Sequence, residues 1–243
     1  MMIDLKVRSN QKELLDEWKG DSHELARVLK DINRVNCMLG GNTITVNAVI
    51  RLIQEHPKES YTIIDMGCAE GNMLRELAMT ARKQHINLNL IGIDLNRDAL
   101  IIAKKASIDF PEIVYHEKDI LNADFSDFSC DIVITTLTMH HFKNPEILNF
   151  AQQFTRLASI GVVINDLQRS VLAYYLFKGF SLIFIKTKVA KLDGLTSIRR
   201  GFLKSELLAL AKSLTNVDHK IDWKWAFRYV WIMRKQQQKN SYE

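Results

Sequence analysis

The sequence has few of the residues that build disulfide scaffolds, collagen or flexible linkers. It contains three cysteines, three prolines and ten glycines among 243 residues. Cys37, Cys68 and Cys130 include no CxxC pair and their number is odd, so neither a disulfide framework nor a zinc knuckle is expected. Scarce proline and glycine argue against Pro-rich and linker-dominated chains. The first residues also lack the apolar stretch of a signal peptide, and together with the cysteine usage this predicts a cytoplasmic protein.

The overall composition is that of an ordinary globular protein. Hydrophobic residues make up 47% and charged residues 25% of the chain, whereas a disordered chain would be poorer in apolar residues. A chain of 243 residues is long enough for one large α/β domain with a sizeable core. The 33 basic and 28 acidic residues give a net charge of +5, which neither demands nor excludes a nucleic-acid partner.

The chain divides into a helical first part and an alternating second part. The helices predicted before residue 58 lie near 11–19, at 22–38 and at 43–55. From Tyr61 on, short apolar runs alternate with amphipathic stretches. The predicted strands are 61–66, 88–94, 112–119, 130–136 and 160–166, with helices near 71–84, 97–106 and 146–158. Nearly continuous Val, Ile and Leu runs separated by helices predict a parallel sheet covered on both faces.

The last part of the chain breaks this alternation. A long apolar helix at 171–189 and a shorter one at 203–214 are expected to precede two extended segments, 219–225 and 228–233. Because only two residues separate the extended segments, they are expected to form an antiparallel hairpin. The fold prediction is therefore a doubly wound, Rossmann-like α/β sheet of seven strands that ends in an antiparallel β-hairpin. Its expected domains are an N-terminal helical cap (1–58) and a main domain (59–243) with a helical, lid-like insertion at about 167–202.

Three aspartates end successive predicted strands: Asp65 the first, Asp94 the second and Asp119 the third. Open α/β sheets bind ligands at the carboxyl ends of their strands, so these side chains are expected around one ligand site. Asp94 can accept hydrogen bonds from both hydroxyls of a ribose. Asp119 would face an adenine-like amine, with Ile120 as an apolar wall beside the ring. The alternative is a structural turn with solvated carboxylates at the strand ends.

The loop after the first predicted strand, DMGCAEGN at 65–72, has the glycines of a nucleotide-binding turn. Gly67 and Gly71 allow the backbone to turn tightly and to approach a ligand where a Cβ would collide. A dinucleotide-binding loop reads GxGxxG, whereas Ala69 and Asn72 stand at its second and third glycine positions. The loop therefore disfavours an NAD-dependent oxidoreductase.

With this loop, the motifs GIDLN (92–96), EKDIL (117–121) and SCDIVITTLTMHHF (129–142) resemble the class I S-adenosylmethionine-dependent methyltransferases. The resemblance spans about residues 62 to 166. It implies S-adenosylmethionine as the cofactor, with Gly67 and Gly71 at its methionine part and Asp65 near the ammonium. Family members carry D/E-x-G-x-G-x-G, so Ala69 is a small departure. The full set implied around the cofactor is Asp65, Gly67, Cys68, Ala69, Gly71, Asn72, Asp94, Leu95, Asp119, Ile120 and Thr136.

Flanking stretches extend the resemblance to a small-molecule branch of this family. NRVNCMLGG (33–41), NDLQRS (165–170) and LDGLTSIRRGF (192–202) resemble methyltransferases paired with aromatic polyketide biosynthesis, and the HHF stretch resembles quinone C-methyltransferases. An arginine often follows the double glycine in the polyketide-associated branch. Here Asn42 stands at that position, which puts one contact in doubt.

Candidate catalytic residues follow the fourth and fifth predicted strands. One of His140 and His141 is expected to act as general base, while the other hydrogen-bonds or packs, because adjacent side chains point in different directions. No metal is expected, since neighbouring histidines on a turn rarely converge on one ion and no third ligand is evident. Asp166 would orient an acceptor hydroxyl or a histidine, and Arg169 would bind a carboxylate or phenolate. The alternative is an Asp N-cap with Arg169 on a solvated face.

The expected function is methyl transfer to a small, apolar, aromatic or polyketide-like acceptor, with O-methylation favoured. C-methylation of a quinone precursor and a non-catalytic, cofactor-binding partner protein stay open as alternatives. No nucleic-acid partner is expected, because the [DNS]-P-P-[YFW] stretch of amino-methylating enzymes is replaced by TTLTMHH. The apolar segment 171–190 fits a core helix, a lid over the acceptor or, less well, a peripheral membrane contact. A homodimer is also compatible with it.

Overall fold

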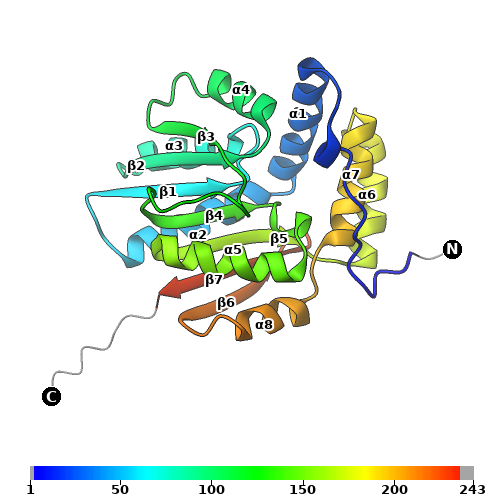
Figure 1. Ribbon diagram of the computed structural model, residues 1–243. Coiled ribbons are helices and arrows are strands. Elements are labelled where there is room, and N and C mark those ends of the chain that lie inside the picture. The colour runs from blue at the N-terminus through cyan, green and yellow to red at the C-terminus, as the bar shows by residue number, and fades with distance from the viewer. Residues whose placement is uncertain (1–2, 236–243) are drawn as a thin grey trace.

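The computed structural model describes residues 3–235 and places a seven-stranded sheet at the centre of the chain (Figure 1). Its strands are β1 (Ser60–Met66), β2 (Asn87–Asp94), β3 (Ile113–Glu117), β4 (Cys130–Thr136), β5 (Ala158–Leu167), β6 (Val217–Lys224) and β7 (Arg228–Lys235). Their order across the sheet is β3-β2-β1-β4-β5-β7-β6. The first five strands pair in parallel, and β7 pairs antiparallel with both β5 and β6. The predicted doubly wound sheet with a terminal hairpin is confirmed.

Helices cover both faces of the sheet because the central strands are apolar on both sides. On one face lie α2 (Gly41–Glu55), α3 (Asn72–Lys83) and α4 (Arg97–Ala106), and on the other α5 (Asn144–Leu157) and α8 (Lys204–Lys212). The inward side chains of β1 show the division, since Ile63 packs in the first core cluster and Ile64 in the second. Val49 and Leu52 of α2 belong to the first cluster, so part of the segment before residue 58 lies directly on the sheet.

A third group of helices stands beyond the carboxyl ends of the parallel strands (Figure 1). It consists of α1 (Ser22–Met38), α6 (Val171–Phe184) and α7 (Lys188–Arg200), which share a small apolar cluster. α6 and α7 approach closely at Gly194, where an added Cβ would come within 2.3 Å of the Phe177 ring. The N-terminal segment, of which residues 3–21 are described, runs along α7, and the described part contains one short 3-10 turn, η1 (Leu15–Glu17). A second such turn, η2 (Met139–His141), follows β4.

Two helix predictions are wrong. The single helix expected at 171–189 is broken after Phe184, because the buried carboxylate of Asp31 accepts hydrogen bonds from the amides of Lys186 and Thr187, at 2.8 and 2.7 Å. The helix expected near 11–19 is an irregular segment. There the carboxylate of Asp193 on α7 accepts hydrogen bonds from the amides of Leu14 and Leu15, at 2.7 and 3.0 Å.

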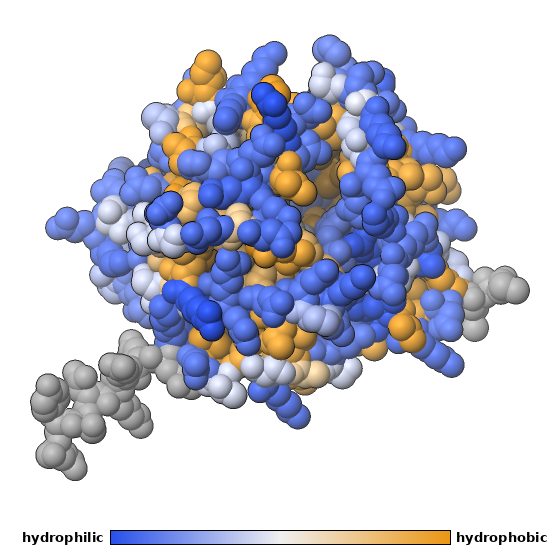
Figure 2. Space-filling view, in the orientation of Figure 1, coloured by the Kyte–Doolittle hydropathy of each residue, from blue (hydrophilic) through white to orange (hydrophobic). Residues whose placement is uncertain are grey.

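The outer face of α6 is apolar and exposed. Leu172, Leu182 and Ile183 are 60%, 70% and 78% exposed, and Figure 2 shows orange side chains at the edge of the molecule where α6 and α7 lie. Within residues 3–235, no helix has the length and apolar character needed to cross a bilayer. α6 therefore presents an apolar surface while its other side faces the interior of the helical group.

Candidate active site

The loop between β1 and α3 is held against the end of β2 by backbone hydrogen bonds. The amides of Gly67 and Cys68 donate to the carbonyl of Ile93, at 2.8 and 3.0 Å. The carboxylate of Asp94 accepts from the amide of Ala69 at 2.7 Å and from that of Asn96 at 2.8 Å. Asp94 thus fixes the loop and at the same time stands at the carboxyl edge of the sheet.

Two glycines of this loop are required by their close neighbours. Gly67 has a φ of +82°, and a Cβ there would come within 2.5 Å of the Thr138 side chain. Gly71 has a φ of +73°, and a Cβ would lie 2.0 Å from the Tyr115 hydroxyl. Any side chain at these positions would be strained as well as crowded. The space beside each glycine is therefore occupied by the protein's own side chains, in addition to whatever ligand the loop holds.

Asp65 lies beneath the loop and is 2% exposed. Its Oδ1 has no hydrogen-bond partner among residues 3–235. Burial raises the pKa of Asp65 to about 8, and the charge of Asp94 adds to the shift. A buried carboxyl that lacks a donor is the kind of group that a cationic ligand atom stabilises in its ionised form.

A cavity of about 800 Å³, here called the polar cavity, opens between the strand ends and the N-terminal segment. Figure 2 shows a hollow on this face of the molecule. The sheet side of the polar cavity contributes five residues that the sequence predicted, Gly67, Asp94, Leu95, Asp119 and Ile120. The opposite side contributes Leu15, Asp16, Glu17, Trp18 and Lys19. The polar cavity thus joins two segments that lie more than forty residues apart.

A second cavity of about 550 Å³, here called the apolar cavity, lies under α6 and α7. Its walls come from α1, α6, α7 and the turn between β6 and β7, and they carry mostly aliphatic and aromatic side chains. These include Leu29, Ile32, Val35, Leu176, Phe177, Phe180, Ile185, Trp225 and Phe227. Leu15 and His141 line both cavities, so the two meet at these side chains.

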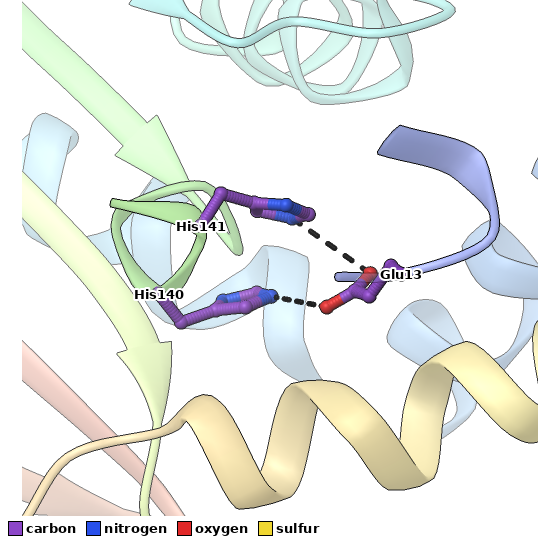
Figure 3. A group of neighbouring side chains, drawn as sticks. All are labelled: Glu13, His140 and His141. Atoms are coloured by element: carbon purple, nitrogen blue, oxygen red, sulfur yellow. Dashed lines mark hydrogen bonds and ion pairs between the residues drawn. The ribbon is translucent and has the colours of Figure 1, made fainter. Parts of the chain in front are cut away.

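A cluster of histidines and carboxylates stands where the cavities meet, and Figure 3 shows three of its members, Glu13, His140 and His141. His140 Nδ1 lies 2.7 Å from Asp166 Oδ1, and His140 Nε2 lies 3.2 Å from Glu13 Oε1. His141 Nδ1 lies 2.7 Å from Asp16 Oδ1, and its Nε2 lies 3.8 Å from Glu13 Oε2. The two rings lie close together, with centroids 4.4 Å apart and planes tilted by 33°. Both imidazoles therefore present Nε2 to Glu13, which the sequence did not identify.

Burial and charge act on His140 in opposite directions. Burial alone lowers the pKa of its imidazole, but the carboxylates of Asp166 and Glu13 outweigh burial and raise the pKa to about 9. His140 is 2% exposed, whereas the side chain of His141 is 27% exposed. His141 is thus the histidine that a ligand in either cavity reaches.

Comparisons with known proteins agree with this geometry. Residues 63–161 match the family model described as a methyltransferase domain. The chain superposes on the plantazolicin methyltransferase BpumL, solved with S-adenosylhomocysteine, with a TM-score of 0.68 and 17% identity, covering 92% of this chain and 94% of that one. The fold is that of the class I S-adenosylmethionine-dependent methyltransferases. The magnesium protoporphyrin IX methyltransferase of Synechocystis also superposes, with a TM-score of 0.55 and 13% identity over 81% of this chain and 84% of that one.

Two curated relatives match parts of the chain. A candidate 23S rRNA (guanine-N(1)-)-methyltransferase of Bacillus subtilis is 32% identical over 129 residues, which is 51% of this chain and 40% of the relative. The carboxy-S-adenosyl-L-methionine synthase of Campylobacter hominis is 31% identical over 109 residues, 44% of each chain. The chain therefore spans about two fifths of the length of these relatives.

Within this methyltransferase fold, several residues expected at the cofactor do not line the polar cavity. Thr136 shares a hydrogen bond of 3.0 Å with the hydroxyl of Thr45, and the Asn72 amide donates to Glu76 at 3.2 Å. The remaining expected residues outside the lining are Asp65, Cys68, Ala69 and Gly71, of which Ala69 lines the apolar cavity. Thr138, two residues after Thr136, lines the polar cavity in its place, because β4 ends at Thr136 and the chain turns there.

Arg169 does not reach the acceptor side, contrary to the prediction. Its guanidinium donates to the carbonyls of Leu5 and Gly201, at 2.9 and 2.7 Å, and forms a bidentate pair with Glu206, at 2.9 and 2.6 Å. The side chain has no exposed surface. Arg169 therefore holds the N-terminal segment and α8 together. Asp166 likewise lines neither cavity, and it contacts the site through His140.

Two arginines that the sequence did not single out hold the histidine turn. Arg200 Nε donates to the carbonyl of His140 at 3.0 Å, and its Nη2 donates to that of His141 at 2.6 Å. Arg8 donates to the carbonyls of His140 and Phe142, at 3.1 and 2.7 Å. These contacts join residues far apart in the chain, so no local pattern could have revealed them.

Proposed function

We propose that the chain transfers a methyl group from S-adenosylmethionine to a small, apolar acceptor. The observation that carries this proposal is that a polar cavity at the strand ends and an apolar cavity under α6 and α7 meet at Leu15 and His141. A methyl donor in the first cavity and an acceptor in the second would face each other across these side chains.

The polar cavity suits an adenosyl group. Asp94 would accept hydrogen bonds from the ribose hydroxyls, and Asp119 would face the adenine amine beside Ile120. Asp65, whose Oδ1 lacks a partner among residues 3–235, would provide the negative charge near the methionine ammonium. The bound S-adenosylhomocysteine of a structural neighbour supports the same cofactor.

Methyl transfer from a sulfonium is an in-line displacement that mainly requires alignment of the acceptor, the methyl group and the sulfur. A dry, apolar cavity favours the reaction, because charge is dispersed as the cationic sulfonium meets its nucleophile. An aromatic or polyketide-like acceptor matches the aliphatic and aromatic walls, and a phenolic oxygen is the favoured methyl acceptor. His141, which lines both cavities, is the group placed to take or to position the hydroxyl proton.

The curated relative with an rRNA substrate raises nucleic acid as another acceptor. We favour a small molecule because α1, α6 and α7 enclose the apolar cavity with aliphatic and aromatic side chains. A flipped base is read by hydrogen bonds to its Watson–Crick edge, whereas apolar side chains outnumber polar ones in these walls.

Two experiments test the proposal. Calorimetric titration with S-adenosylhomocysteine should show one site per chain. A turnover screen with labelled S-adenosylmethionine should then find activity among phenols, resorcinols, quinols and short polyketides, and none on ribosomal RNA. Absence of heat with S-adenosylmethionine and with S-adenosylhomocysteine would contradict the proposal, and labelling of rRNA alone would contradict its acceptor class.

A further inference from the structure

Three side chains at the junction of the cavities direct one potential metal ligand each toward a common point. They are Glu13 from the N-terminal segment and His140 and His141 from η2 (Figure 3). Their ligand atoms all lie within 4.8 Å of one another, and the two Nε2–carboxylate distances are 3.2 and 3.8 Å. Ligands bound to one ion at about 2.0–2.2 Å stand about 3.0–3.6 Å apart, so small side-chain rotations would close the set around a metal.

The groups behind the two imidazoles are those that orient metal-bound histidines. Asp166 accepts from His140 Nδ1 and Asp16 from His141 Nδ1, both at 2.7 Å. A carboxylate at Nδ1 keeps the hydrogen on that nitrogen, so that the Nε2 lone pair can bind an ion that displaces the Nε2 hydrogen. Each carboxylate is itself fixed, Asp166 by the amide of His140 at 3.0 Å and Asp16 by Arg200 at 2.8 Å.

Acidic side chains predominate among the direct contacts of the two imidazoles. Three carboxylates contact the imidazoles, those of Glu13, Asp16 and Asp166. Asp16 also forms an ion pair with the guanidinium of Arg200. Glu13 and Asp166 are 7% and 2% exposed, so water screens them little. A divalent ion at Nε2 of both histidines would take the place of the proton that these carboxylates hold on His140, so that both imidazoles are neutral in the metal-bound state.

We propose that Glu13, His140 and His141 bind a divalent transition-metal ion, and that this ion activates the acceptor oxygen. Two imidazoles and one carboxylate suit zinc or iron(II) better than magnesium or calcium, which prefer oxygen ligands. All three residues line the apolar cavity, so the open coordination positions face the acceptor. The inference rests on the proposed function, because it assigns the metal to the same acceptor.

Methyl transfer at this site needs no reactant beyond the acceptor, S-adenosylmethionine, the ion and Glu13. The acceptor hydroxyl binds the metal, which lowers the pKa of the hydroxyl, and its proton passes to the carboxylate oxygen of Glu13 that the metal leaves free. The oxygen–methyl bond forms as the methyl–sulfur bond breaks. The electron pair of the broken bond stays on sulfur, which leaves as the neutral thioether, and the proton on Glu13 then passes to water.

The test uses cobalt(II) as a coloured probe on the full chain after chelator treatment. We expect one equivalent of cobalt to bind and to give the visible absorption bands of a protein-bound ion with nitrogen and oxygen ligands. Glu13→Gln and His141→Ala should each weaken cobalt binding by about a hundredfold or more, and Asp16→Asn by about 10–100-fold, as for residues that orient metal ligands. His85→Ala, on an exposed turn, is the matched control and should bind as the wild type does.

Titration with S-adenosylhomocysteine on the metal-free proteins separates the two proposals. Glu13→Gln keeps the size and hydrogen-bonding capacity of the side chain, so its cofactor binding should stay within about threefold of wild type. If Glu13→Gln also lost cofactor binding, Asp166→Asn, which lines neither cavity and orients His140, would separate metal binding from cofactor binding. Wild-type protein that binds S-adenosylhomocysteine but shows no cobalt bands, or ligand variants that bind cobalt as well as the control does, would overturn the metal site alone. Failure of the wild type to bind S-adenosylhomocysteine would overturn the proposed function instead.

Discussion

The sheet side of the polar cavity and the walls of the apolar cavity are built from the chain in opposite ways. Five of the residues that line the polar cavity come from the loops after β1, β2 and β3, which are neighbours in the sheet. The apolar cavity draws on α1, α6, α7, the hairpin turn and the N-terminal segment, which are distant in sequence. A site formed at the ends of parallel strands follows from local rules, whereas a site formed by packed helices depends on long-range contacts.

The largest expected effect comes from His141, one of the two residues that line both cavities. His141→Ala should lower turnover by roughly 10²–10⁴, because the variant loses a group that positions the acceptor hydroxyl, either directly or as a ligand of the proposed ion. Steady-state kinetics with the best acceptor from the screen would measure it, with His85→Ala as control.

The same variant tests whether the two cavities are functionally separate. S-adenosylhomocysteine affinity should stay within about threefold of wild type, since Asp94 and Asp119 are unchanged. A large loss of cofactor affinity would show that the junction belongs to the cofactor site as much as to the acceptor site.

The second effect is confined to the polar cavity. Asp94→Ala removes the acceptors for the ribose hydroxyls and should weaken S-adenosylhomocysteine binding by about 1.5–3 kcal/mol, the range for hydrogen bonds to a charged group. Calorimetry would measure it, and Asp109→Ala, on an exposed turn, is the control. Because Asp94 also accepts from the amide of Ala69, Asp94→Asn should lose less than Asp94→Ala. Equal affinity in wild type and Asp94→Ala would remove Asp94 from the cofactor site.

A pH effect is expected from Asp65, which lies buried beneath the loop that borders the polar cavity. Burial, and then the charge of Asp94, raise the pKa of Asp65 to about 8, so in the free protein this carboxyl is protonated below that pH. The cationic ammonium of S-adenosylhomocysteine favours the ionised carboxylate, so binding releases a proton and affinity rises with pH from 6 to 8, by at most about tenfold per unit.

The stability of the free protein should follow the same group with the opposite slope. A carboxyl whose pKa is raised on folding stabilises fully below its ordinary value near 3.9, and this contribution is lost as pH rises toward 8. Asp65→Asn should reduce the pH dependence of both the S-adenosylhomocysteine affinity and the free energy of unfolding. Denaturant unfolding and calorimetry at pH 6, 7 and 8 would measure them, and an unchanged affinity slope in Asp65→Asn would assign the effect to another group.

Particular residues show how far the sequence could lead. Asp94 and Asp119 were predictable because strand ends and glycine turns leave local patterns, and the order of elements followed from the periodicity. Glu13 was not, because it lies in an irregular segment whose position depends on contacts such as that of Asp193 with the amide of Leu14. Arg169 was assigned to the acceptor because it follows β5, but its direction is set by Glu206, 37 residues further along the chain.

A smaller effect tests whether α6 closes the apolar cavity. Amides of 171–184 should gain about tenfold in hydrogen-exchange protection when S-adenosylhomocysteine and a phenolic ligand at about ten times its dissociation constant bind together. The amides of α5, on the sheet and away from both cavities, provide the control. Strong protection of α6 in the free protein that ligands leave unchanged would assign it to static packing or to an interface.

The smallest effect concerns the position where the chain departs from the family's glycine pattern. Ala69 has a φ of +46°, a conformation that costs an alanine about 1 kcal/mol, whereas glycine adopts it freely. Its methyl group packs against the cluster of Leu25 and Leu29, and removing a buried methyl costs about 0.8 kcal/mol. The two terms nearly cancel, so Ala69→Gly should change the unfolding free energy by less than about 0.5 kcal/mol and leave cofactor affinity unchanged.

Gly71→Ala is the contrasting variant, because its Cβ would meet the Tyr115 hydroxyl at 2.0 Å, and it should be clearly destabilised. Denaturant unfolding of both variants would decide whether backbone hydrogen bonds to Ile93 and Asp94 fix the loop, as these expectations assume. A large loss in Ala69→Gly would show instead that the loop depends on the methyl group, and that the polar cavity is supported by the same helical packing that forms the apolar one.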